Sequence, residues 1–495
     1  MAARDVIGRA VAVAAAVLLV AGCATLTPQD DERHVQQWLD DRVPEGPAWG
    51  EEAAEIQARI DELLAEPLGP GEAVRVAMLA NPEIQSGMAV AGMSRAEVIQ
   101  ASRLPNPRLG LGLAVSSESG ARTEIHTGIA FDLMALFLRP ARQDIADREY
   151  ERDTRRVAHS LVDLATRVES AWFHYVGTRQ VAEMRAIITE AAEASAELAE
   201  RFYRAGNISE LQLERERAAA TRARLEAGRA ELDARRARLA LNRLMGLSSN
   251  RDRWRAAERL PAVLEVAESE ANLLATARAR RLDLQSLEYE VAALERAFDA
   301  SRRWRYVADV GERHLTPAGA VDLGVVRERE SDGERLIGPT LGLRLPVFDQ
   351  GQGSLARADA RLAYARGRLD ARRLDVEREV RQALVDAETG HAMALEYRDS
   401  LIPQREAIVA RSQEFHDYMF IGAFELIAAR QLEYDAYQGY IEAVRDFWLA
   451  RVELARAVGA SLAMPFDKDE MLDFDRLLAP PEEEEHDPHR HHRHH

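Results

Sequence analysis

The chain has 495 residues, 30% of them charged, and a formal net charge of −18 at pH 7. This acidic balance argues against nucleic acid as a partner, because phosphate binding needs a basic surface. Alanine, leucine, arginine and glutamate dominate the composition, which favours long helices and coiled coils. The sequence holds no phosphate-binding loop, zinc-protease motif or nucleophile elbow, so we expect a protein that is not an enzyme.

Residues 1–22 have the pattern of a secretory signal peptide. Two arginines precede an apolar run at 11–20, which is too short to remain in a bilayer as a spanning helix. Cys23 is the only cysteine, and the four residues that end on it resemble a bacterial lipobox, whose cysteine receives lipid such as palmitate. We therefore expect a lipoprotein, delivered to the outer membrane because Ala24 follows in place of aspartate. The alternative is an ordinary signal with an incidental cysteine.

Residues 23–70 are polar, acidic and rich in proline, so we expect a lipidated linker that carries short helices. The segment 72–102 is then predicted to be helical. Asn81-Pro82 predicts an early break in it, because the residue before a proline avoids the helical conformation.

Two β-hairpins are predicted, at 107–133 and 304–348, because apolar residues there alternate with small or polar ones. This pattern fits a soluble sheet packed on helices, and it also fits the wall of a membrane barrel that is apolar outside and polar inside. Four strands cannot close a barrel, so a barrel would need further copies of the chain. His126 falls on the polar face, where a wet pore lining is expected. The apolar positions are Leu109, Leu111, Leu113, Val115, Ile125, Ile129, Phe131, Val321, Leu323, Val325, Leu341, Leu343, Leu345 and Val347.

A long helical hairpin is predicted after each β-hairpin. The first covers 140–246, with a turn at 203–209 where glycine and asparagine tolerate positive φ. The second covers 354–459, with a turn at Ile421-Gly422 and a kink at Pro403. Their apolar positions keep roughly heptad spacing, so these helices are expected to pair as coiled coils.

The chain repeats itself, and the repeat sets its organisation. Phe202–Gly246 and Asp417–Gly459 both begin with an aromatic residue before a glycine break, continue as a charged helix and end on glycine. We therefore divide the chain into a first repeat at 71–258, a second repeat at 259–463 and an acidic, histidine-rich tail at 464–495.

Taken in this order, the motifs resemble those of the TolC family of outer-membrane efflux proteins. The resemblance covers most of 71–463, and the motif Leu104–Pro107 is closer to the heavy-metal-efflux branch than to the multidrug branch. The motifs are Asn81-Pro82, Leu104–Pro107, Tyr203–Gly206, Arg281–Leu284 and Leu345–Gly351.

The resemblance implies a mainly helical fold with a membrane β-barrel. Three copies of the chain would close a barrel of about twelve strands, and the helical hairpins would form a periplasmic tunnel. It further implies a passive channel in the outer membrane that works with a periplasmic adaptor and an inner-membrane pump of the RND or a similar type. The alternative is a structural coiled-coil lipoprotein of the cell envelope with no pore.

In the family the pore narrows at the periplasmic helix tips, where a tyrosine, an arginine and aspartate rings lie. Phe424 stands at the arginine position here, while Ala428 and Gln431 stand at the aspartate positions, so that ionic latch is missing. The nearby carboxylates have two interpretations: they form an acidic ring, or they are ordinary solvated charges at the helix tips. These carboxylates are Glu210, Glu214 and Glu425.

The tail places six histidines beside four consecutive glutamates. Neutral imidazoles and carboxylates are good ligands for copper or zinc, but this spacing fixes no geometry. We expect no resident cofactor, and either transient binding of Cu or Zn or a merely solvated tail. The histidines are His486, His489, His491, His492, His494 and His495.

Overall fold

A computed structural model describes residues 28–460, except for short gaps. The predicted signal peptide, Cys23 and the histidine-rich tail lie outside the described residues. The chain divides into two compact units: 28–38, 86–157 and 286–368 form the first, and 39–85, 158–285 and 369–460 the second. The gaps are at 41, 44–46, 48–51, 115–122, 249–252, 258, 307, 311–314, 318–320, 330–333 and 344–346.

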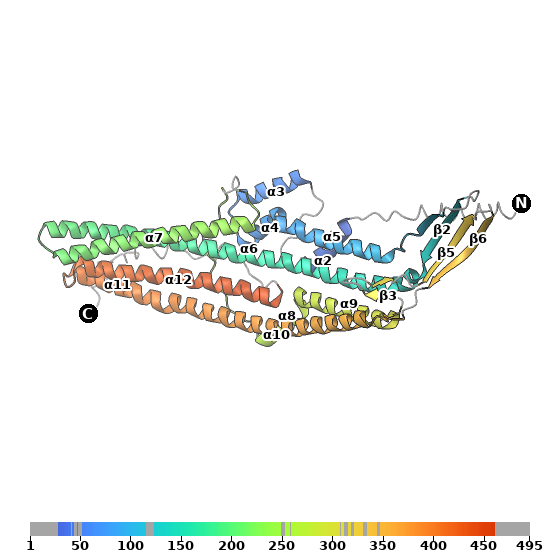
Figure 1. The fold of residues 1–495 in the computed structure, drawn as a ribbon. Helices are drawn as coiled ribbons and strands as arrows, with labels where there is room; N and C mark the ends of the chain where they lie inside the picture. Colours follow the sequence, from blue (N-terminus) through green and yellow to red (C-terminus); the bar gives the residue numbers. More distant parts are fainter. Residues whose placement is uncertain are drawn as a thin grey trace, which may run out of the picture. The chain divides into compact units, whose positions relative to one another are not determined.

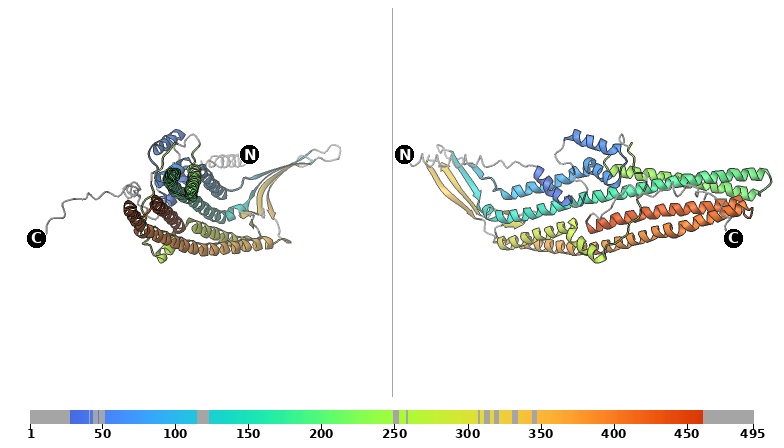
Figure 2. Two further views of the ribbon diagram at one scale, coloured as in Figure 1. Left: turned by 90° about the vertical axis from the view of Figure 1, so that its left-hand side faces the viewer. Right: turned by 180° about the vertical axis from the view of Figure 1, so that it is seen from behind.

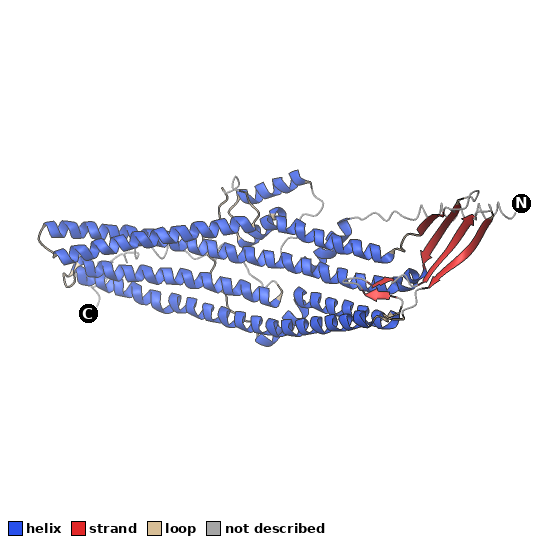
Figure 3. Ribbon diagram, in the orientation of Figure 1, coloured by secondary structure: helices blue, strands red, loops and turns tan. Residues whose placement is uncertain are grey.

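The first unit contains a four-stranded antiparallel sheet, which confirms both predicted hairpins (Figures 1 and 3). Its strands are β1 (Arg108–Ala114), β2 (Glu124–Asp132), β5 (Val321–Arg329) and β6 (Arg335–Leu343), in the order β1-β2-β5-β6. The pairing of β2 with β5 therefore joins the hairpins of the two repeats into one sheet.

The last strand lies earlier in the sequence than predicted. The alternation at 341–347 predicts a strand there, whereas β6 ends at Leu343, which pairs with Val321, the first residue of β5. The predicted strand position Leu345 lies outside the described residues, and Val347 lies outside the described sheet. A small two-stranded sheet, β3 (Ala308–Val310) and β4 (Leu315–Pro317), was also not predicted.

Helices of the first unit flank these strands in sequence. They include α2 (Pro28–Leu39), most of α5 (Pro82–Ser102), the start of α6 (Leu133–Arg204), most of α9 (Leu282–Trp304) and the start of α10 (Gln352–Glu396). One apolar cluster packs between α6 and α9; its buried members are Met134, Leu138, Ile145 and Ala300.

Helix α6 begins directly after β2, earlier than the predicted start at Pro140. The carboxylate of Asp132 accepts hydrogen bonds from the backbone N–H groups of Met134 (2.9 Å) and Ala135 (3.2 Å). This cap satisfies two N–H groups that a helix start leaves without partners. The cap at Asp132 and the burial of Leu138 fix the start of α6 before Pro140. Pro140 therefore lies inside the helix.

Helix α2 is fastened to α6 by polar contacts. The hydroxyl of Tyr150 donates to Asp31 (2.7 Å), and Nε2 of His34 lies 3.1 Å from a carboxylate oxygen of Glu151. The contact with His34, together with the hydrogen bond from Arg155, lowers the pKa of Glu151 from 4.5 to about 2 despite partial burial. The charged form of Glu151 thus helps to hold α2 in place.

The second unit contains both helical hairpins, as predicted. The later part of α6 pairs with α7 (Glu210–Leu244), and the later part of α10 continues through α11 (Ile402–Asp417) to a turn and α12 (Ala423–Val458) (Figure 2). Short helices α3 (Ala53–Ala65), α4 (Pro70–Ala80) and α8 (Glu270–Arg280) complete the unit. None of the described helices is both long and apolar enough to cross a membrane.

A π-helical turn, Tyr397–Leu401, separates α10 from α11 just before Pro403. Proline cannot donate to the carbonyl of Asp399, so the regular ladder is interrupted where a kink was predicted. At the end of α12, Gly459 adopts the left-handed conformation with φ of 70°, which confirms the predicted glycine stop.

Aromatic rings fill the centre of the second unit. Trp172 packs edge-on against Phe173, whose ring stacks on Trp448 at 5.1 Å, and all three are buried. Each indole N–H donates to a backbone carbonyl at 2.9 Å, that of Leu68 from Trp172 and that of Pro261 from Trp448. The polar end of each buried tryptophan is thus satisfied.

Candidate functional site

The four-stranded sheet has two unlike faces, which follow from its register. Residues directly opposite one another in a ladder share a face, so Leu111 shares one with Thr127, and Leu323 with Phe131 and Leu341. The large apolar side chains of this face are exposed, Leu111 to 73%. The other exposed members are Leu109, Leu113, Ile125, Ile129, Phe131, Leu323, Val325, Ile337, Leu341 and Leu343.

The opposite face carries mainly small and polar residues, with Val326 and Leu336 as its larger apolar members. His126 lies there between two carboxylates, with Nδ1 3.3 Å from Glu328 and Nε2 3.9 Å from Glu124. Arg108 forms an ion pair with Asp322 on the same face. His126 lies on the polar face, as predicted, and its own strand and the neighbouring strand bring it two acidic partners.

No described helix of the first unit covers the apolar face, since its side chains remain exposed. This observation disfavours the soluble sheet packed on helices, in which one face would be buried. An exposed apolar patch of this extent marks an interaction with a membrane or with another protein.

The turns of the two helical hairpins form a second candidate site, in the second unit. In the first turn the N–H of Asn207 donates to the carbonyl of Phe202 (2.9 Å), and the hydroxyl of Ser209 caps α7 by accepting from Gln212 N–H (3.3 Å). In the second turn the N–H of Phe420 donates to the carbonyl of Phe415 (2.8 Å). Both turns are thus closed by their own backbone.

An aromatic contact joins the two turns. The ring of Phe424 meets that of Phe202 edge-on with centroids 6.0 Å apart, and both side chains are half-buried. Such a pair is worth about 0.5–1.5 kcal/mol beyond its buried area. The predicted gate residue Phe424 is therefore packed between the hairpins rather than free in solution.

The predicted acidic residues are all exposed. Glu210 and Glu425 lie in the first turns of α7 and α12, where a carboxylate is favourable beside the positive end of the helix dipole. Glu214 accepts a hydrogen bond from Arg217 at 2.9 Å. The structure thus places these three carboxylates near the joined turns.

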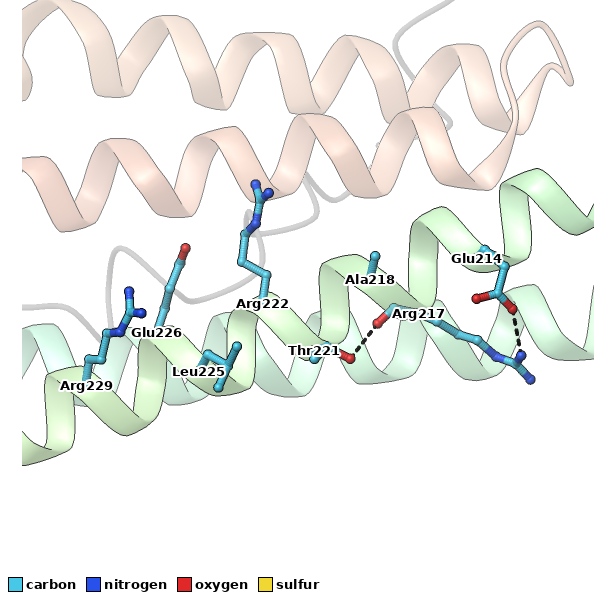
Figure 4. Close-up of a pocket in the computed structure, with 8 residues that line it drawn as sticks. All are labelled: Glu214, Arg217, Ala218, Thr221, Arg222, Leu225, Glu226 and Arg229. Atoms are coloured by element: carbon cyan, nitrogen blue, oxygen red, sulfur yellow. Dashed lines mark hydrogen bonds and ion pairs between the residues drawn. The ribbon is translucent and has the colours of Figure 1, made fainter.

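Two exposed apolar features were missed by the sequence analysis. The second turn presents Tyr418, Met419 and Phe420, with Met419 90% exposed. Helix α7 carries a heptad series beside a shallow hollow whose lining includes Leu225 and Arg229 (Figure 4). Counting in sevens from Leu211 finds this series, which consists of Leu211, Ala218, Leu225, Leu232 and Leu239.

A buried ion cluster lies elsewhere in the second unit. Arg281, 2% exposed, donates to Asp283 (2.8 and 2.9 Å), Glu379 (2.6 Å) and the carbonyl of Ala457 (3.1 Å). Arg372 contacts both carboxylates at 2.7 and 2.8 Å. Burial alone would raise the pKa of Asp283, but the two guanidinium groups hold that pKa well below its usual range. The motif Arg281–Leu284 thus contributes Arg281 and Asp283 to a buried ion cluster that has a structural role.

Within the described part of the chain, no group of three or more histidine, cysteine or acidic side chains is placed to hold a metal ion. The histidines proposed as metal ligands lie outside the described residues.

Comparisons with known proteins were made by sequence and by structure. No protein-family model matches this sequence, and no curated protein matches it. The outer-membrane channel OprN superposes with a TM-score of 0.65 at 16% identity, over 85% of this chain and 96% of that one. The Campylobacter jejuni CmeC outer-membrane channel gives 0.65 at 13%, over 86% and 93%. CusC, whose structures concern transmembrane channel formation, gives 0.61 at 14%, over 82% and 92%.

At these identities the likeness concerns the fold, and it extends over most of each chain. The solved structures of this fold named above are channels and not enzymes. The chain therefore shares the fold of these outer-membrane channels, which is the fold that the resemblance of its motifs to the TolC family implied.

Proposed function

We propose that the protein is the outer-membrane channel of a tripartite export system. It would conduct passively whatever an inner-membrane pump delivers through a periplasmic adaptor. The observation that carries this proposal is the sheet with one exposed apolar face and one polar face, which is the pattern of a transmembrane barrel wall. The solved channels of the same fold support the role.

The sheet supports a trimeric assembly. In a single described chain, β1 and β6 are edge strands with unpaired backbone groups, which natural proteins cover or pair. Three copies would join β6 of one protomer to β1 of the next and so close the barrel.

The helices offer a matching seam for the neighbouring copy. The heptad series of α7 is an exposed stripe of the kind that packs in coiled coils. The helices α10 and α11 carry exposed apolar residues that can cover it, namely Leu374, Val385, Met393, Ile408 and Phe415.

The joined turns are the proposed periplasmic mouth. The contact of Phe202 with Phe424 ties the two hairpins of one protomer, so both turns would move together. Glu210, Glu214 and Glu425 would then form acidic rings, and such rings favour cations in a pore.

Lipid anchoring at Cys23 and metal as cargo extend the proposal. The lipobox pattern supports an anchor in the outer membrane, and the tail supports the capture of copper or zinc in the periplasm, outside the duct and near the adaptor. Deleting 482–495 should leave assembly unchanged and lower the binding of Cu²⁺ to the purified protein, measured by calorimetry at pH 7. Equal binding by the truncated protein would remove the support for metal cargo.

The channel proposal is tested on the full chain purified in detergent from an outer membrane. Native mass spectrometry should find three copies, each with an acylated amino-terminal Cys23, and planar bilayers should show ion conductance. A monomer that does not conduct would favour the structural coiled-coil lipoprotein. An unmodified amino terminus on a conducting trimer would overturn only the lipid anchor.

A further inference from the structure

Three arginines lie together at one end of the apolar face of the sheet. Arg329 and Arg335 are directly opposite each other across β5 and β6, and Arg327 is opposite Ile337. Side chains of a cross-strand pair start about 5 Å apart, and those two residues apart on one strand about 7 Å. The three guanidinium groups can therefore reach one common ligand.

The charges at this end of the sheet are sorted by face. Glu124, His126 and Glu328 occupy the polar face, whereas the three arginines share the face of Leu113 and Ile125. Within the described residues none of these arginines has an ion-pair partner, and Nε of Arg329 is shielded from solvent without a hydrogen bond. Arg327 and Arg335 are exposed.

The position of the arginines marks a membrane boundary. A cationic side chain on the lipid side of a barrel is costly at the bilayer midplane and tolerated near the interfaces. The chain connects β5 to β6 at this end, whereas β2 runs into α6 at the other end. In the proposed channel, whose helices are periplasmic, the arginine end lies in the outer leaflet; this step rests on the proposed function.

We infer that Arg327, Arg329 and Arg335 form a binding site for the phosphate groups of an outer-leaflet glycolipid. Guanidinium groups bind phosphate through two parallel hydrogen bonds, which an ammonium group cannot do. The apolar side chains below the arginines, such as Leu341 and Val325, would contact the acyl chains of the same lipid. Each protomer of the trimer would carry one such site.

The test counts glycolipid bound to the purified trimer by native mass spectrometry. The probes are diphosphoryl lipid A, the same lipid with its phosphates removed, and inorganic phosphate as a competitor. The main variant carries Arg327→Gln, Arg329→Gln and Arg335→Gln, and a second carries lysine at the same positions. The matched control removes the same charge from exposed arginines of α6 and α7, namely Arg201→Gln, Arg235→Gln and Arg236→Gln.

The wild type and the control should bind the diphosphorylated lipid equally. The triple glutamine variant should bind it roughly 100-fold more weakly, and the lysine variant should fall between them. Binding of the dephosphorylated lipid should not differ among the variants. Unchanged binding by the glutamine variant, or displacement of the lipid by millimolar inorganic phosphate alone, would overturn the inference. Trimer mass and conductance are measured on the same samples, so a failure of the channel itself is seen separately.

Discussion

The sheet of the first unit and the aromatic centre of the second place large apolar side chains in opposite surroundings. Leu111 and its neighbours on the sheet are exposed, while the polar residues form the other face. In the second unit Trp172 and Trp448 are buried, and their polar N–H groups are paired with carbonyls. Hydrophobic burial is thus completed inside the second unit and left open on the sheet, whose apolar face is available to a membrane or to another protein.

The largest expected effect comes from Trp448→Ala. Truncating a fully packed tryptophan leaves a cavity and an unpaired carbonyl at Pro261. The free energy of unfolding should therefore fall by about 3–5 kcal/mol. Urea unfolding of the detergent-solubilised protein, followed by helical circular dichroism, measures this. The control is Leu111→Ala on the sheet, which should change the midpoint little. Equal losses of stability in Trp448→Ala and Leu111→Ala would contradict the contrast between the two regions.

A charge on the open face tests its surroundings directly. Leu341→Arg should impair membrane insertion by about 2–4 kcal/mol near the midplane. Thr340→Arg, one residue away on the polar face, should be tolerated. Membrane fractionation and the amount of trimer compare the two. If both variants insert equally well, the apolar face does not contact lipid.

A smaller, pH-dependent effect is expected where α2 meets α6. The pKa of Glu151 is lowered in the folded state, so its contribution to stability is complete above pH 4.5 and is lost as the pH falls towards about 2. The protection of the α2 amides, measured as their hydrogen exchange relative to the intrinsic rate at each pH, should therefore fall over this interval in the wild type. Glu151→Gln should show fast exchange already at pH 6. A protection of the α2 amides that stays constant over this interval would show that the contact with His34 is not what holds the helix.

The smallest expected change concerns the helix tips. Replacing Glu210, Glu214 and Glu425 with glutamine should leave trimer stability unchanged and reduce cation preference, read as a shift in reversal potential under a salt gradient. The control is Glu231→Gln, which removes a charge from α7 at a position far along the helix from the turn. An unaltered reversal potential would place the selective region elsewhere.

Much of this fold was predictable from periodicity. Alternation located β1 and β2, and the glycine stop at Gly459 was visible in the sequence. The start of β6 was missed because Pro339 interrupts the alternation; an edge strand tolerates a proline that a central strand would not.

Contacts between distant segments could not be predicted in the same way. The pairing of Phe202 with Phe424 and the partners of His126 depend on which strands and turns meet in space. The heptad series of α7, by contrast, was present in the sequence and needed only a count in sevens.

The buried guanidinium of Arg281 has a consequence for how the protein resists degradation. It holds the carbonyl of Ala457 in the last turn of α12, Asp283 in the first turn of α9 and Glu379 in α10. Fraying of the end of α12 would therefore expose the buried Arg281 cation or leave it without its carbonyl partner. Because this is costly, the helix end opens together with a larger cooperative unit. Proteases that require an unwound segment would therefore find this helix end closed until the surrounding unit opens.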